Sequence, residues 1–229
     1  MPQHTDKLFE DELKILKEDI LKMGGLVEEM LAKSSKALIE RDTNLARQVL
    51  KQDPDVNRLE VLIDDHCLEL LARWQPAASD LRFITIGLRI SKDLERMGDL
   101  AVDICEQVVE INKEPPLKSL GESPFDDFSL ISEKTKQMVK EALDAFVRQD
   151  AELAQRVCEA DDEVDDLKRK LFDDLVNLMQ TNLEVVRRGT RLILVSRHLE
   201  RIADHATNIA EEVIFMVKGK DIRHGGNLQ

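Results

Sequence analysis

Residues 91–106 read SKDLERMGDLAVDICE and residues 196–211 read SRHLERIADHATNIAE, so one pattern occurs twice without a gap. Each copy contains a glutamate followed four residues later by an aspartate, Glu95 with Asp99 and Glu200 with Asp204. Further identities between the two halves of the chain occur at a spacing of 108 residues before the motif, and the motif copies are 105 residues apart. The chain is therefore predicted to contain two copies of one structural module.

Apolar residues around both motifs recur at alternating steps of three and four residues, the spacing of a helix with one buried face. The first series is Phe83, Ile86, Ile90, Leu94, Met97, Ala101, Ile104, Val108 and Ile111, and the second is Val195, Leu199, Ile202, Ala206, Ile209, Val213 and Met216. Such stripes face the core of an antiparallel helical bundle. In the first half the pattern predicts helices over about 6–40, 43–73 and 79–111. We expect Pro54 to kink or interrupt the second of these, and Ser79 or Asp80 to cap the third.

The predicted fold is all-α, with two tandem similar three-helix bundles that arose by internal duplication. Residues 1–112 form the first predicted module and residues 122–219 the second. A Pro-rich connector is expected over 113–121, because the surrounding stretch NKEPPLKSLGESP (112–124) contains helix-breaking prolines. Residues 220–229 are expected to form a flexible tail.

Composition excludes several classes of function. The net charge of −13 and an aromatic content of 3% argue against a nucleic-acid partner, which needs basic and base-stacking surfaces. Three cysteines without a CxxC pair favour a reducing compartment. The charged N-terminal stretch does not resemble a signal peptide, and the longest aliphatic run, LILV (192–195), is too short to insert into a membrane. These features predict a cytoplasmic protein.

Carboxylates four residues apart form a row along each motif helix. The rows are Glu95, Asp99 and Asp103, and Glu200, Asp204 and Asn208. We expect them on the side of the helix away from the buried stripe. Charged residues there usually serve solubility, but like charges at this spacing repel each other, and the arrangement recurs in both modules. Bound cations would relieve that repulsion, so the rows are predicted metal sites.

A second acidic row lies on the preceding helix of each module. The weaker metal candidates there are Asp53, Asn57, Asp161 and Asp165. Whether the two rows meet depends on helix rotation, which the sequence leaves open. His198 and His205 are interpreted as flank residues, since no histidine follows a glutamate by three residues as in di-iron bundles.

The doubled motif, each copy LERxxD followed by A..I.E, resembles the PhoU family of phosphate-signalling proteins. The stretch QPAASDLR (75–82) is similar to a turn of that family, and the second half has NLEVVRRGTRL in its place. The resemblance implies a homodimeric or higher homo-oligomeric adaptor that regulates phosphate uptake and represses the phosphate-starvation response. Its implied partners are the ATPase subunit of the phosphate ABC transporter and a sensor histidine kinase. Some members bind metal clusters through the E/DxxxD motif, and the matching residues are Glu95, Asp99, Glu200 and Asp204.

The metal is left open among iron, zinc, manganese and magnesium. No catalytic residue is predicted, because the sequence has no Gly-rich phosphate loop and no defensible nucleophile–base spacing. Two alternatives remain at this point. A carboxylate metalloenzyme would need buried carboxylates joined by histidine. A purely structural bundle would need no matched carboxylate rows.

Overall fold

The computed structural model describes residues 2–114 and 122–219, and every regular element within them is helical. The elements are α1 (Pro2–Glu40), α2 (Thr43–Arg73), α3 (Ala78–Ile111), α4 (Glu122–Arg148), α5 (Ala151–Thr181), the short 3-10 helix η1 (Leu183–Val185) and α6 (Val186–Lys218). The predicted all-α fold with two three-helix bundles is confirmed. The predicted tail, and the predicted connector beyond residue 114, lie outside the described residues. Over the described part of the chain, no helix combines the length and apolar character needed to cross a bilayer.

The turn between the first two helices of each module shows the duplication in the backbone. Arg41 and Gln149, 108 residues apart, both have positive φ, 56° and 52°, and end α1 and α4. The next residue in each case is an aspartate that caps the following helix. The Asp42 carboxylate accepts hydrogen bonds from the backbone N–H groups of residues 44 and 45, and the Asp150 carboxylate does the same for residues 152 and 153. The same local chemistry therefore produces both helical hairpins.

The expected side-chain cap of α3 is wrong, and of the two outcomes expected for Pro54 the interruption of the helix does not occur. Pro54 does not interrupt α2, which continues through it to Arg73. Val49 and Val56, on either side of the proline, are fully buried, and this packing holds the helix together where one backbone hydrogen bond is lost. Helix α3 begins at Ala78 after the N-cap residue Ala77, without a side-chain cap, and Asp80 instead places its negative charge in the first turn.

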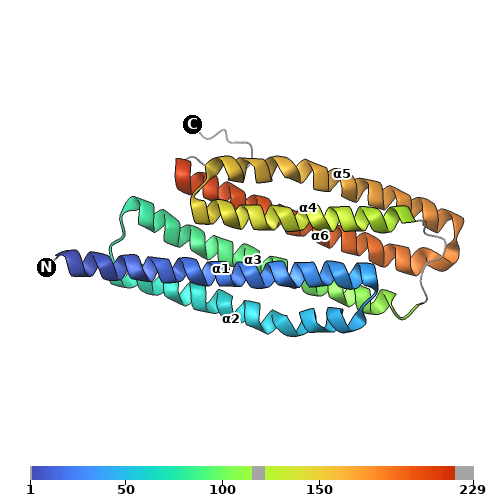
Figure 1. Cartoon of the computed structure of the whole chain (residues 1–229), viewed down its shortest axis with the longest axis horizontal. Coiled ribbons are helices and arrows are strands. Elements are labelled where there is room, and N and C mark those ends of the chain that lie inside the picture. The colour runs from blue at the N-terminus through green and yellow to red at the C-terminus, as the bar shows by residue number, and fades with distance from the viewer. Residues whose placement is uncertain (1, 115–121, 220–229) are drawn as a thin grey trace.

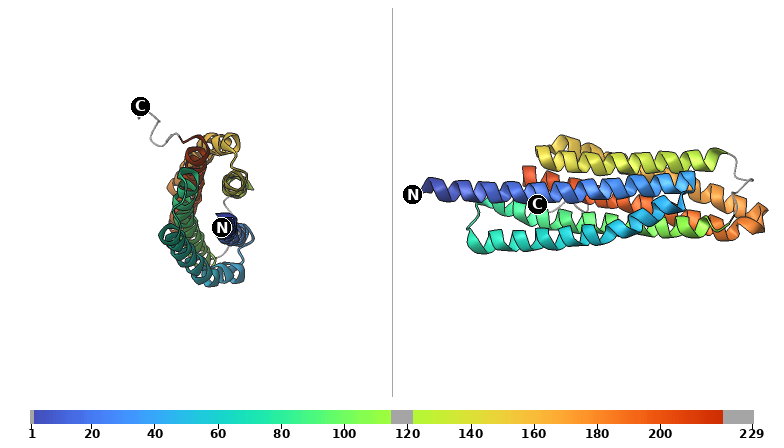
Figure 2. Two further views of the ribbon diagram at one scale, coloured as in Figure 1. Left: turned by 90° about the vertical axis from the view of Figure 1, so that its left-hand side faces the viewer. Right: turned by 60° about the horizontal axis from the view of Figure 1, so that its bottom comes forward.

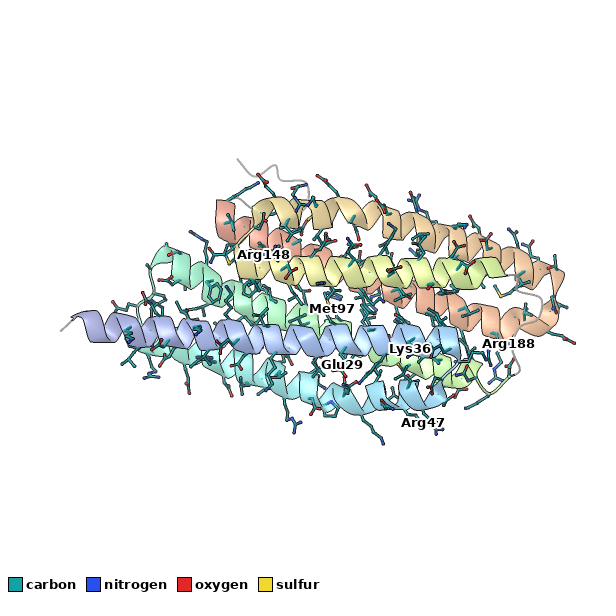
Figure 3. All side chains as sticks on the ribbon, viewed as in Figure 1. Glu29, Lys36, Arg47, Met97, Arg148 and Arg188 are labelled. Carbon is teal, nitrogen blue, oxygen red and sulfur yellow. The ribbon has the colours of Figure 1, made fainter. Side chains whose placement is uncertain are left out.

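The helices run roughly side by side, with α3 and α6 antiparallel at the centre (Figure 1). Seen end-on, α2, α3, α6 and α5 form a curved layer, and α1 and α4 lie on its concave side (Figure 2). The modules contact each other mainly through α3 and α6, and also through α1 and α4. One apolar core runs through both modules. Met97, labelled in Figure 3, is fully buried near its centre, and Leu94 and Leu199 of the predicted stripes are also fully buried.

Candidate metal sites in two acidic seams

The two predicted carboxylate rows of the first module face each other between α2 and α3. We call this the first acidic seam; its residues are Asp53, Asn57, Glu60, Glu95 and Asp99. Burial and the nearby Asp99 carboxylate raise the pKa of Asp53, which lies on the other helix. Burial, Asp99 and Glu60 raise the pKa of Glu95. The rows are thus close enough to repel each other across the seam, which the sequence could not establish.

Glu95 differs most from the sequence-based expectation. Its side chain is only 14% exposed, so it does not point away from the buried side of α3. The reason is that α3 is covered by several helices, and its flank beside Leu94 packs against α2. The Glu95 Oε2 atom is buried and accepts no hydrogen bond. Arg96 Nε lies 3.4 Å from this atom, and Arg96 also donates a hydrogen bond to Asp99.

The second acidic seam lies at the matching place between α5 and α6, and its residues are Asp161, Asp165, Lys168, Glu200 and Asp204. Burial, together with Asp204 and Asp165, raises the pKa of Asp161 to about 6. Burial, Glu200 and Asp165 also raise the pKa of Asp204. A lysine stands inside this seam, because Lys168 Nζ donates a hydrogen bond of 2.9 Å to Glu200 Oε1.

The last member of each predicted row does not extend its seam. Asp103 Oδ2 lies 3.7 Å from His198 Nδ1 on α6, and Asn208 donates a 3.4 Å hydrogen bond to Asp93 on α3. His205 Nδ1 is 2.8 Å from the same Asp93 carboxylate. These residues therefore join the two modules. The sequence showed the residues themselves but gave no signal for the α3–α6 contact that brings them together.

The side chains of the seams have the chemistry of a cation site, but they are not gathered around one point. Within residues 2–114 and 122–219, no group of three or more His, Cys, Asp or Glu side chains is placed to hold a metal ion. The donors are all oxygen atoms, which suit magnesium and manganese better than soft-ligand metals. Glu95 Oε2 is buried without a hydrogen bond, and a bound cation would give this atom a partner. The donor set fits a cation, provided that the carboxylates change rotamer to share it.

The fold and the seams together define a duplicated all-α protein built from two three-helix modules, each with one acidic seam. The PhoU domain family matches residues 20–108 and 128–213. The chain belongs to the PhoU family.

Several relatives resemble the chain over nearly its whole length. It is 41% identical to a Pseudomonas aeruginosa protein named phosphate-specific transport system accessory protein PhoU homolog, over 99% of this chain and 92% of that one. It is 34% identical to the Escherichia coli accessory protein PhoU, over 98% and 91% of the two chains. The crystal structure of PhoU from Pseudomonas aeruginosa superposes with a TM-score of 0.87 at 39% identity, covering 93% of this chain and all of that one. The relatives are named as accessory proteins and not as enzymes, in agreement with the prediction of a non-enzymatic protein.

Proposed function

We propose that this protein is a cytoplasmic accessory protein of phosphate-specific transport that regulates phosphate uptake and represses the phosphate-starvation response. In this role it is an adaptor between the ATPase subunit of the transporter and a sensor histidine kinase, and it acts as a homodimer or higher homo-oligomer. The observation that carries the proposal is the match to accessory proteins of this transport system at up to 41% identity over nearly the full chain.

The acidic seams are the proposed metal-binding part of this function. Asp53, Glu95 and Asp99 would hold a cation in the first acidic seam. In the second acidic seam the ligands would come from Asp161, Asp165, Glu200 and Asp204. A bound cation supplies positive charge and open coordination positions at a surface that is otherwise anionic.

Metal occupancy would then change which partner surface each seam prefers. Without a cation, the clustered carboxylates favour a basic patch on the partner. With a cation, the same face can attract a carboxylate or phosphate group. The carboxylates themselves gain from the cation. Burial first, and then the neighbouring carboxylates, raise the pKa of Asp53, Glu95 and Asp204, and a bound cation would offset both effects. The seams are thus proposed to couple metal binding to partner choice.

The test is a variant that removes the charge of both motifs and keeps their size. Its substitutions are Glu95→Gln, Asp99→Asn, Glu200→Gln and Asp204→Asn. We expect the wild type to retain metal after dialysis, and the variant to remain helical but to lose both the metal and the repression of phosphate-starvation genes. Metal content is measured by mass spectrometry and repression with a reporter gene.

A matched control separates the seams from the overall charge of the protein. It neutralises four carboxylates that are at least 55% exposed and lie outside the seams: Glu18, Glu40, Glu163 and Asp166. The control should keep both metal and repression. A folded seam variant that represses like the wild type would show that the seams are only a solvated surface.

A further inference from the structure

The two acidic seams are copies of each other, but they differ in charge at two positions of the first helix in each seam. The neutral Asn57 of α2 matches Asp165 of α5, and at the second position the sign of the charge is reversed. Glu60 of α2 stands where Lys168 stands in α5, 108 residues later. Each of these two side chains contacts a residue of the next long helix that lies 32 positions later in the chain. Glu60 accepts a hydrogen bond from Lys92, and Lys168 donates one to Glu200. The duplication has therefore replaced a carboxylate by an ammonium group in the second acidic seam.

The basic residues of the first acidic seam approach it from the solvent side. Lys92 is 58% exposed and Arg96 is 51% exposed. Both belong to α3, the helix that carries Glu95, and they leave the Glu95 Oε2 atom buried without a hydrogen bond. A small cation could enter this seam without removing a buried lysine.

In the second acidic seam the positive charge is more deeply placed. Lys168 is 34% exposed, and Glu200, its partner, is 18% exposed. The Lys168 ammonium comes from the opposite helix, donates a hydrogen bond to Glu200 and also lies near Asp204. Among the described residues, the buried side-chain oxygens without a hydrogen bond include Glu95 Oε2 and none from the second acidic seam. The second acidic seam therefore contains an internal counter-charge.

We propose that Lys168 is a built-in counter-cation of the second acidic seam, so that a divalent cation binds first in the first acidic seam. The second acidic seam accepts a cation only when the cation displaces Lys168 from Glu200. The lysine is tethered beside Glu200, so it competes at a high effective concentration, whereas a free ion must be supplied from solution. The inference rests on the cation binding proposed above and adds an order of loading to it.

The probe is Mn²⁺ alone, measured by equilibrium dialysis at low ionic strength with the full chain. We expect the wild type to show one tight and one weaker class of site. Lys168→Met nearly keeps the length of the side chain and removes its charge. It should therefore lower the dissociation constant of the weaker class by about tenfold and leave that of the tight class unchanged. Lys134→Met is the matched control, because it removes a lysine of the same module that pairs with the exposed Glu163. This control should leave both classes as they are.

Two double variants assign the classes to the modules. Glu95→Gln with Asp99→Asn should abolish the tight class, and Glu200→Gln with Asp204→Asn should preserve it. Circular dichroism shows that each variant is folded. Two results would overturn the proposed role of Lys168 but leave the proposed cation binding intact. One is loss of the tight class in Glu200→Gln with Asp204→Asn, and the other is a weaker class whose affinity does not change in Lys168→Met. If neither the wild type nor Lys168→Met binds Mn²⁺, the proposed cation binding itself is overturned.

Discussion

Asp161→Asn is expected to stabilise the metal-free protein at neutral pH. Asp161 lies in the second acidic seam, faced by Asp204 and Glu200 from α6 and by Asp165 and Asp162 from its own helix. Burial and these charges raise its pKa from 3.8 to about 6. A carboxyl with a raised pKa binds its proton more tightly in the folded state than in the unfolded state. Its ionisation therefore opposes folding above about pH 6, and this effect disappears as the pH falls towards 4.

The size of the effect follows from the difference between the two pKa values. Each pKa unit corresponds to about 1.4 kcal/mol, so ionisation of Asp161 would lower the free energy of unfolding at pH 7 by at most about 3 kcal/mol. Asp161 is only partly buried, and solvent and Lys168 screen its neighbours, so we expect about 1–2 kcal/mol. Asparagine has the same shape and no charge. The variant should therefore gain this amount at pH 7 and only about a third of it at pH 4.5.

The assay is urea denaturation of both proteins at several pH values between 4.5 and 7, in a chelating buffer. Titrating groups that do not interact with Asp161 contribute equally to both proteins and cancel in the difference. These include His198, whose pKa is lowered chiefly by burial. Asp166→Asn is the control, since Asp166 is on the same helix and 72% exposed. A gain that is independent of pH, or an Asp161→Asn protein that is less stable than the wild type at pH 7, would refute the electrostatic reasoning.

Two further predictions concern the fold. Leu94→Asp places a charge at a fully buried site and should lower the free energy of unfolding by about 3–5 kcal/mol, whereas Leu62→Asp, at a side chain that is 47% exposed, should change it little. Equal melting temperatures for Leu94→Asp and wild type would mean that Leu94 is not in the core. Asp42→Ala and Asp150→Ala each remove a helix cap and should each cost about 1 kcal/mol in urea denaturation. Unequal costs would contradict the equivalence of the two turns.

The sequence predicted the fold well because the fold depends on local patterns. The steps of three and four residues in α3 and α6 reflect one buried face, and residues such as Leu94 and Leu199 are indeed buried. The cap of α3 was predicted wrongly, because Asp80 acts through its charge in the first turn and not through a cap hydrogen bond. Whether Pro54 interrupts its helix was left open, because continuity depends on tertiary packing, which local propensity does not describe.

The candidate sites were predictable only in part. Glu95 and Asp99 could be found from the repeated motif, and the spacing placed them on one helix face. Their relation to Asp53 could not be found, because it depends on how α2 and α3 are rotated against each other. The contact between Lys168 and Glu200 could not be predicted for a similar reason, since it joins two helices whose register is fixed by packing.

The interface between the modules gives a physical reason for two places where the copies differ. His198 stands where the first module has Asp93, and Asn208 stands where it has Asp103. In the structure Asp103 contacts His198, and Asp93 contacts Asn208. If the second module had kept the residues of the first, aspartate would face aspartate at both contacts, and each like-charge pair would weaken the interface. The packing of α6 against α3 therefore explains the loss of a carboxylate at Asn208, independently of any metal. The same two differences favour the pairing of a first module with a second module over the pairing of two copies of the first module.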